Sequence, residues 1–381
     1  MRTALWMAAA AALLAAGCSE GQKGEAVAAP RGASGYSIET VAEGLNFPWG
    51  VAFLPDGAML VTERNGGLRV IGADGALAPA PVEGLPAIFA KRQAGLFEVE
   101  LDPNFAENRL LYLAYAAGTE KANGLKVARA RFDGRALSDL QVIWQAAPLK
   151  NTSAHYGGRL QFLPDGTLLI THGDGYDFKE KAQDLGSHHG KIVRINADGS
   201  IPQDNPFVGR AGAKPDIYSY GHRNVQGIVR DPATGAVYAH EHGPRGGDEL
   251  NRISAGANYG WPVITYGIDY SGAIISPFKE KAGMEQPLVY WVPSIAPSGM
   301  TLYSGAAFPQ WRGDFLVSTL AGSHVRRVDM ENGQVRGQEQ LFAELGERIR
   351  DVAEAPDGSL LLLTDSPEGK VLRVRPKRAE T

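Results

Sequence analysis

The sequence predicts an all-β fold, a six-bladed β-propeller of four-stranded antiparallel blades, and three observations support this prediction. The 381 residues include 47 glycines and 23 prolines, a composition that favours many tight turns over long helices. One turn motif, Pro-Asp-Gly, is repeatedly followed by an apolar run that is typical of a strand. The turns also recur at a long interval, as the blades of a propeller do.

The repeated turn is clearest at Pro55-Asp56-Gly57, Pro164-Asp165-Gly166 and Pro356-Asp357-Gly358. Proline presets φ for such a turn and glycine takes its positive-φ position, so each copy is expected to close a hairpin. Looser copies contain Pro103, Pro232 and Pro309. The intervals between the six prolines, at 55, 103, 164, 232, 309 and 356, are 48, 61, 68, 77 and 47 residues, or about 60 on average. Six such units predict six blades, and a β-sandwich, which needs no long repeat, ranks second.

The propeller is expected to occupy residues 36–376 as one domain, followed by a short tail at 377–381. A β-rich segment near Tyr36–Val41 stands before the first repeat, and another near Val371–Val374 stands after the last. Pairing of these two segments would close the ring, because a closed propeller needs every blade to meet its neighbours.

The N-terminus predicts export. Arg2 precedes an apolar run from Ala4 to Ala16, which is long enough for a signal peptide and too short to cross a bilayer. Small residues then precede Cys18, the only cysteine of the chain, as in a bacterial lipobox. We therefore expect a signal peptide at residues 1–17, a lipidated Cys18, and a flexible tether at 18–35 that anchors a periplasmic protein to a membrane. An ordinary secretory peptide is the alternative.

The overall charge excludes a simple nucleic-acid binder. The net charge is -4 and the pI is about 6.1, so no basic face for phosphates is evident. The sequence also lacks a dinucleotide-binding fingerprint, a P-loop and a Gly-x-Ser-x-Gly nucleophile elbow. Redox chemistry would therefore need another kind of cofactor.

His155 is the first candidate for chemistry, in the segment His155-Tyr156-Gly157-Gly158-Arg159. Imidazole titrates near neutral pH and can take a proton from a hydroxyl. Asp174 could orient the ring through its other nitrogen. On its residues alone, the segment also fits an ordinary turn histidine.

Three further segments carry candidate ligand-binding groups. Arg223 and Asn224 offer fixed donors to a carbonyl or a carboxylate. Gly243 and Pro244 could expose consecutive carbonyl oxygens, which suit Ca²⁺. The acids that follow them, Asp248 and Glu249, are expected to bond loop amides rather than metal.

Arg348 and Arg350 alternate along a predicted strand, so both side chains would face one side and could clamp a polycarboxylate. A solvent-facing pair would look the same in sequence. Gln93 says little by itself. His240 and His242 also alternate, which makes a weak case for zinc because no third ligand is obvious.

Taken together, these segments resemble the soluble PQQ-dependent glucose/sorbosone dehydrogenase family, and they are most similar to its aldose sugar dehydrogenase branch. The resemblance runs from about Val41 to Arg375. Its most specific parts are His155–Arg159, Ala182–Leu185 with Gly190–Arg194, Tyr220–Asn224, Glu241–Glu249, Asn258–Pro262 and Arg348–Asp351. The family fold is a six-bladed propeller.

The resemblance implies PQQ- and calcium-dependent oxidation of an aldose at C1 to the lactone, with electrons passed to an external quinone or redox protein. It implies that His155 is the base, that Arg223 polarises the quinone carbonyl, and that Asp174 is the acid beside the base. The remaining implied ligands are Gln93 and Asn224 for the cofactor, Arg348 and Arg350 for its carboxylates, and the Gly243 and Pro244 carbonyls for Ca²⁺.

Two departures from the family pattern leave the substrate open. A cofactor-contacting lysine is replaced by Ala321-Gly322-Ser323, and the aromatic pair over the sugar is not matched around Trp291. A calcium-dependent sugar lactonase and a non-catalytic binding propeller on the same scaffold therefore remain as alternatives.

Overall fold

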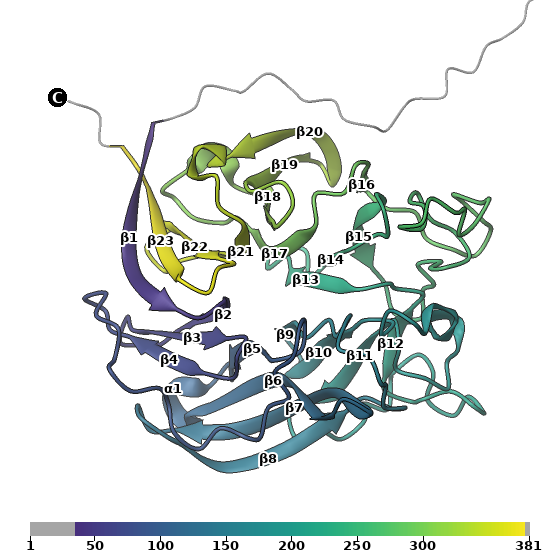
Figure 1. The fold of residues 1–381 in the computed structure, drawn as a ribbon, viewed down its shortest axis with the longest axis horizontal. Coiled ribbons are helices and arrows are strands. Elements are labelled where there is room, and N and C mark those ends of the chain that lie inside the picture. Colours follow the sequence, from purple (N-terminus) through teal and green to yellow (C-terminus); the bar gives the residue numbers. More distant parts are fainter. Residues whose placement is uncertain (1–34, 378–381) are drawn as a thin grey trace, which may run out of the picture.

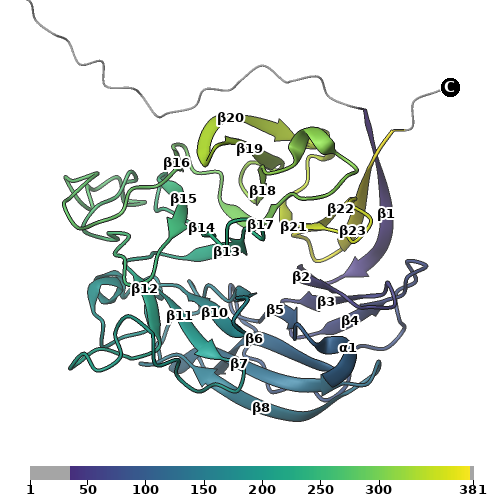
Figure 2. The same cartoon turned by 180° about the vertical axis from the view of Figure 1, so that it is seen from behind.

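The computed structural model describes residues 35–377, and it confirms the all-β six-bladed propeller. Six antiparallel sheets surround a common centre (Figure 1), and the ring is equally clear from behind (Figure 2). The signal peptide, Cys18 and nearly all of the tether and tail fall outside the described residues. Within residues 35–377, no helix has the length and apolar character needed to cross a bilayer.

Each blade begins with a strand near the centre of the ring and continues outward. The first three blades are β2(Pro48–Phe53)-β3(Met59–Glu63)-β4(Leu68–Ile71), β5(Leu96–Leu101)-β6(Leu110–Thr119)-β7(Ala122–Phe132)-β8(Leu137–Gln145) and β9(Leu160–Phe162)-β10(Thr167–His172)-β11(Lys191–Asn196)-β12(Ile217–Tyr220). The other three are β13(Val225–Arg230)-β14(Val237–Glu241)-β15(Asp248–Ile253)-β16(Val289–Trp291), β17(Pro297–Leu302)-β18(Phe315–Thr319)-β19(Val325–Glu331)-β20(Gln334–Leu341) and β21(Ile349–Glu354)-β22(Leu360–Thr364)-β23(Gly369–Pro376)-β1(Tyr36–Leu45). Short helical turns, α1(Phe105–Asn108), η1(Lys179–Gln183), η2(Pro309–Trp311) and η3(Ala343–Leu345), lie in the connections.

Five blades have four strands, and the β2-β3-β4 blade has three. An extended segment occupies the fourth position of that blade, where the Ala78 and Val82 amides donate to the carbonyls of Val70 and Leu68. The sheet edge is therefore covered, although the segment is too irregular to count as a strand.

The six turn prolines mark equivalent places in the six blades. Each lies between the first and the second strand of its blade, from Pro55 between β2 and β3 to Pro356 between β21 and β22. Gly57, Gly166 and Gly358 have φ of +86°, +79° and +78°, as the turn requires. The uneven intervals arise from loops inserted elsewhere, including the 254–288 connection of the fourth blade.

The predicted closure of the ring is confirmed. β1 pairs with β23 in antiparallel register from Tyr36 opposite Pro376 to Leu45 opposite Gly369. Strands from both ends of the domain therefore complete one blade, which appears in Figure 1 as a purple strand beside a yellow one.

Arg159 occupies the centre of the ring. The residue is 5% exposed, and all three guanidinium nitrogens have hydrogen-bond partners. Its contacts come from the five other blades, namely the Trp49 ring, the Glu98 and Asp351 carboxylates and the Gln226 and Ser298 carbonyls. A buried charge is tolerated only when it is paired in this way, so Arg159 fixes the blades relative to one another.

Candidate active site

His155 lies just before β9, four residues from the central Arg159, and it is 5% exposed. Its Nδ1 is 2.7 Å from Oδ1 of Asp174, which follows the end of β10. Because the carboxylate accepts a hydrogen bond from Nδ1–H, the lone pair of a neutral ring lies on Nε2. Within residues 35–377, no protein group bonds to Nε2, which leaves it available to accept a proton.

The backbone around His155 is held in an uncommon conformation. His155 has φ of +52°, in the left-handed region that few side chains favour. Its amide donates to Oε1 of Gln93 at 2.9 Å. The two glycines that follow are required by space, because a Cβ on Gly157 would lie 2.6 Å from the Thr171 carbonyl and one on Gly158 would lie 2.8 Å from Phe97. The motif therefore packs the chain tightly against β10 and β5 and presents the imidazole.

Asp174 is itself held from two further directions. Its Oδ2 accepts from Nε1 of Trp261 at 2.8 Å, and its Oδ1 accepts from the Tyr176 amide at 2.8 Å. Burial opposes ionisation of Asp174, but the attraction and hydrogen bond of His155 outweigh it and lower the pKa of the carboxyl. Burial disfavours the charged form of His155 as well, so it lowers the pKa of the imidazole, although Asp174 opposes this shift. The pair is thus a neutral base beside an ionised orienting acid.

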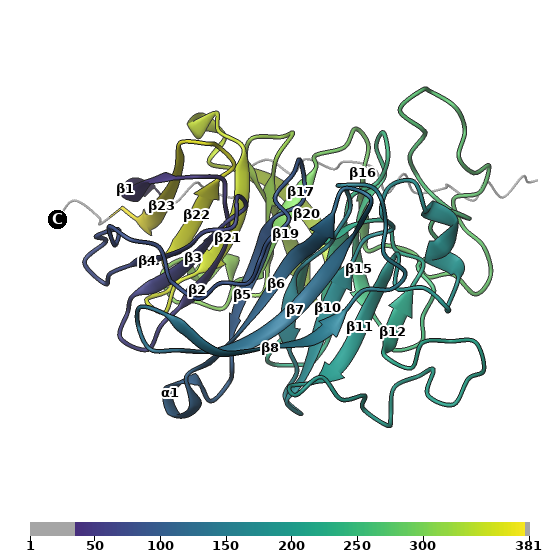
Figure 3. The same ribbon diagram turned by 60° about the horizontal axis from the view of Figure 1, so that its bottom comes forward.

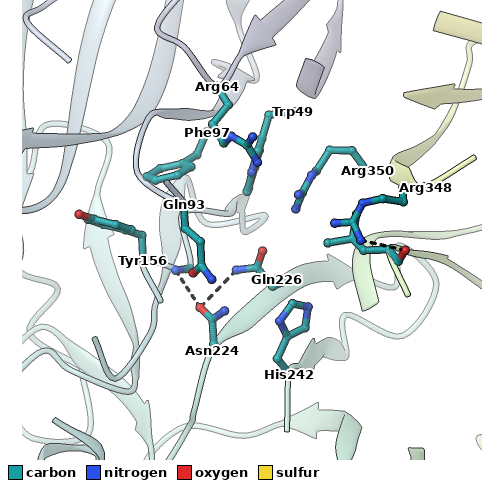
Figure 4. A pocket seen from close by; sticks show the side chains of 12 residues that line it. Trp49, Arg64, Gln93, Phe97, Tyr156, Asn224, Gln226, His242, Arg348 and Arg350 are labelled. Atoms are coloured by element: carbon teal, nitrogen blue, oxygen red, sulfur yellow. Dashed lines mark hydrogen bonds between the residues drawn. The ribbon is translucent and has the colours of Figure 1, made fainter. Parts of the chain in front are cut away.

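Four of the five predicted cofactor ligands meet in one cavity of about 150 Å³ at the centre of the ring, here called the main cavity. Figure 4 shows side chains from several blades pointing toward this space. Four of them were predicted, namely Gln93, Asn224, Arg348 and Arg350. Trp49, Arg64, Tyr156 and His242 also line the cavity. The lining therefore combines cationic groups and amide donors with flat aromatic rings.

Arg348 and Arg350 lie together, as the alternation predicted. Both bond to Asp365, which follows β22: Arg348 Nη2 is 2.9 Å from Oδ2, and Arg350 Nη2 is 2.9 Å from Oδ1. Arg348 Nη1 also donates to the Leu320 carbonyl at 3.1 Å. Burial, together with the neighbouring arginines, lowers the pKa of Arg350 despite its bond to Asp365. One carboxylate thus fixes the direction of both guanidiniums.

Arg223 lies beside this cavity rather than in its lining. Its Nη1 donates to the Gly243 carbonyl at 2.6 Å and to the His242 carbonyl at 3.1 Å, and its guanidinium lies 5.4 Å from the Trp261 ring centre. Arg223 and Trp261 help to line a second cavity of about 270 Å³, with Tyr176, Pro244, Asp269 and Tyr270. The Tyr176 ring lies edge-on to His155, 5.1 Å between centres, so this second cavity adjoins the imidazole through Tyr176.

The loop that holds Gly243 and Pro244 is shaped by Asp248. Its Oδ1 accepts from the Gly243 amide at 2.9 Å, and its Oδ2 accepts from the Ile295 and Ala296 amides at 2.8 and 3.0 Å. This confirms that Asp248 bonds loop amides. The Gly243 carbonyl accepts from Arg223, whereas no described residue donates to the Pro244 carbonyl.

The histidine pair does not form a metal site. His240 lies in β14 and is fully buried beneath Gly227, whereas His242 lies beyond the strand end and its Nε2 bonds to the Pro297 carbonyl at 2.7 Å. Among the described residues, no group of three His, Cys, Asp or Glu side chains could hold a metal ion. Trp291 is also a core residue, 1% exposed and bonded to Gln338, so it does not face the site.

Sequence reasoning missed several residues because no motif marks them. Lys150 is 2% exposed, and its amine contacts the Ala154 carbonyl and lies 3.4 Å from both the His155 carbonyl oxygen and the Tyr156 ring centre. Burial lowers the pKa of Lys150 to about 7. Trp261 and Asp365 carry no such mark either, although Trp261 lies within the family segment Asn258–Pro262; only the fold brings them to the site.

Comparisons with known proteins identify the family of this chain. The family model described as glucose/sorbosone dehydrogenase matches residues 45–373. The chain belongs to this family.

Relatives and solved structures extend the match over nearly the whole domain. The aldose sugar dehydrogenase YliI of Escherichia coli is 40% identical over 347 residues, which cover 90% of this chain and 93% of the relative. The apo structure of the soluble aldose sugar dehydrogenase of E. coli has a TM-score of 0.87 and 38% identity, covering 90% of this chain and all of that chain. The PQQ-bound aldose sugar dehydrogenase of Streptomyces coelicolor has a TM-score of 0.74 and 27% identity, covering 90% and 98%.

Proposed function

We propose that this protein oxidises an aldose at C1 to the lactone, with PQQ and Ca²⁺ as cofactors and an external quinone or redox protein as electron acceptor. The observation that carries the proposal is the His155–Asp174 pair beside a cavity lined by arginines and amide donors. Family membership and the PQQ-bound relative support the same reading.

The base is His155. Its Nε2 takes the proton of the C1 hydroxyl, while Asp174 holds the ring in the required tautomer and stabilises the imidazolium that forms. A 2.7 Å bond and near-complete burial make this orientation strict. The low pKa of His155 keeps the ring unprotonated at neutral pH, as a base must be.

The lining of the main cavity fits PQQ, a planar aromatic tricarboxylate. Arg348 and Arg350 are positioned to hold carboxylates, and the amides of Gln93 and Asn224 are positioned to donate to ring oxygens and nitrogens. When bound, the quinone supplies the two-electron acceptor that the protein lacks. Arg223 would donate to a quinone oxygen as negative charge develops there.

The Gly243 and Pro244 carbonyls fit Ca²⁺ in their chemistry, because both are hard oxygen ligands on one loop. The Gly243 oxygen now accepts from Arg223 at 2.6 Å. Binding of Ca²⁺ to this oxygen would therefore compete with that hydrogen bond and free Arg223 to face the cofactor. The metal would act as a Lewis acid on the cofactor.

The second cavity is the proposed sugar site. It adjoins the base through Tyr176 and Trp261, and it is bounded by residues of the 254–288 connection, which projects beyond the blades in Figure 3. Aromatic faces and charged rims such as Tyr270 and Asp269 suit a hydroxyl-rich ring with apolar C–H faces.

The test is dye reduction by the purified protein with PQQ, Ca²⁺ and a panel of aldoses. Reduction that needs both the sugar and the quinone is the expected result. Release of acid from a lactone without quinone would favour the calcium-dependent hydrolase, and neither reaction would favour a non-catalytic binding propeller. The lactonase alternative has less support, since the described residues offer no cluster of acidic metal ligands.

The N-terminal sequence supports the proposed location. A signal peptide at residues 1–17 and a lipidated Cys18 would place the enzyme in the periplasm, tethered to a membrane. Radiolabelled palmitate should enter the wild-type protein and not Cys18→Ser.

A further inference from the structure

Arg64 lines the main cavity, yet no motif marks it. It follows the last residue of β3 in the first blade, and its backbone is fixed, because its amide donates to the Phe47 carbonyl and its own carbonyl accepts from the Leu96 amide. Its guanidinium lies 4.1 Å from the Phe47 ring centre. The side chain is 21% exposed. Its position is thus determined by the fold and faces the same space as Arg348 and Arg350 (Figure 4).

The charges around the cavity do not balance. Among the described residues, Asp365 is the one carboxylate within 4.0 Å of the guanidiniums of Arg64, Arg348 and Arg350. Three positive charges and one negative charge leave a net charge of +2 (3 − 1) facing one cavity. Burial and the two neighbouring arginines lower the pKa of Arg64, as uncompensated repulsion should. An anion in the cavity would relieve this repulsion.

Arg64 differs from Arg159, Arg348 and Arg350 in how its guanidinium donors are used. The Arg159 guanidinium donates hydrogen bonds to five acceptor atoms in the centre of the ring. Arg348 and Arg350 each bond to Asp365. The Arg64 guanidinium, by contrast, lies 3.7 Å from Asp365 and makes no hydrogen bond to any residue between 35 and 377. Its donors are therefore available to a ligand.

We propose that Arg64 is a third carboxylate-binding residue of the main cavity, delivered by the first blade opposite the Arg348–Arg350 pair. The inference rests on the proposed function, since it takes the ligand to be a planar aromatic polycarboxylate such as PQQ. Arg64 supplies there the positive charge that the Ala321–Ser323 loop lacks. A guanidinium that contacts the ligand from a separate blade also fixes how the planar ligand is rotated within its own ring plane.

The test is a binding titration, independent of turnover. PQQ is added to the cofactor-free protein with Ca²⁺, and quenching of tryptophan fluorescence gives the Kd. Arg64→Met keeps the stem on Phe47 and removes the charge, and it should raise the Kd about 10- to 100-fold. Arg64→Lys should recover part of the loss. Arg336→Ala removes the same charge from an exposed site on β20 and should leave the Kd unchanged.

Equal affinity of wild type and Arg64→Met, with both folded by circular dichroism, would overturn the inference. A second titration with benzene-1,3,5-tricarboxylate separates it from the proposed function. If the wild type binds this tricarboxylate through Arg64 but not PQQ, the carboxylate site stands and the quinone function fails. If PQQ binds without any contribution from Arg64, the quinone function stands and the proposed role of Arg64 fails.

Discussion

At the scale of single residues, the candidate site depends on how His155 and Asp174 are supported. Asp174 accepts three hydrogen bonds, from His155, Trp261 and the Tyr176 amide, so its position is determined before any ligand binds. On the backbone side of His155, the Lys150 amine donates to the carbonyls of Ala154 and His155 and so holds this segment in place. Such pre-positioning is what a proton transfer in a defined direction requires.

Replacing Asp174 by Asn tests the role of the acid. The amide keeps the shape but cannot stabilise an imidazolium, so kcat should fall by about 10²- to 10⁴-fold. Burial lowers the pKa of His155 and Asp174 opposes this shift, so removing the carboxylate lowers that pKa further. Activity needs the neutral ring and rises with pH through its pKa; the acid limb of kcat/KM should therefore move to lower pH. A limb that stays in place would show that another group is the base.

Single residues were predicted only where a motif carried them. His155, Arg223, Asn224 and the Arg348–Arg350 pair stand in recognisable segments, and the structure places all of them at or beside the main cavity. Arg64, Lys150 and Asp365 follow strands of ordinary composition. Their proximity is produced by blades distant in sequence, which no local pattern records.

At the scale of elements, the first strands of the blades surround the centre of the ring, and the loops before them carry His155, Arg223 and Asn224. β5 shows this most clearly, because Glu98 bonds to Arg159 at 2.7 Å and Glu100 lies two residues along on the same face. Both line a third cavity, of about 220 Å³, together with Arg159. Burial, with the nearby Glu98, raises the pKa of Glu100 to about 8.

Glu100→Gln should remove a pH dependence of stability. The raised pKa means that the folded protein binds a proton on Glu100 between about pH 4.5 and 8, where the unfolded chain has released it. This stabilisation is full below pH 4.5 and is lost as pH rises through 8. At pH 9, urea unfolding should therefore show Glu100→Gln to be more stable than wild type by about 1–2 kcal/mol.

At pH 4.5 the difference between these two proteins should nearly vanish. Glu107→Gln, on α1, is the control and should behave as wild type at both pH values. A wild-type stability that stays flat from pH 5 to 9 would contradict the assignment.

Elements were predicted better than their edges. The three Pro-Asp-Gly turns and their three looser copies together marked the first hairpin of every blade, since turn chemistry is local. The short fourth position of the β2-β3-β4 blade and the 254–288 connection were not predicted in detail. Their paths depend on which neighbouring blades they cover, which is set by tertiary packing.

At the scale of the whole molecule, the ring is held by two devices, the central Arg159 and the joint between β1 and β23. The joint brings together residues more than 300 positions apart, such as Ser37 opposite Arg375. Contacts of this kind are entropically costly to form, so the joint is expected to open early in unfolding.

A cross-link across the joint tests this expectation. Ser37→Cys with Arg375→Cys, on facing positions of the two strands, should form a disulfide that raises the midpoint of thermal unfolding by several degrees. Reduction with dithiothreitol should reverse the gain, and Ser37→Cys alone should give none. A disulfide that forms without changing the midpoint would show that unfolding begins elsewhere.

The central claim is that His155 and the arginine-lined cavity together oxidise a sugar with a bound quinone. Single-turnover absorbance of the PQQ- and Ca²⁺-loaded protein, mixed with an aldose and no external acceptor, tests it most directly. We expect loss of the quinone absorbance with one equivalent of lactone per bound PQQ, and no such change in His155→Ala that still binds PQQ. An unchanged quinone spectrum in the loaded wild type with every aldose, or full reduction in His155→Ala, would contradict it.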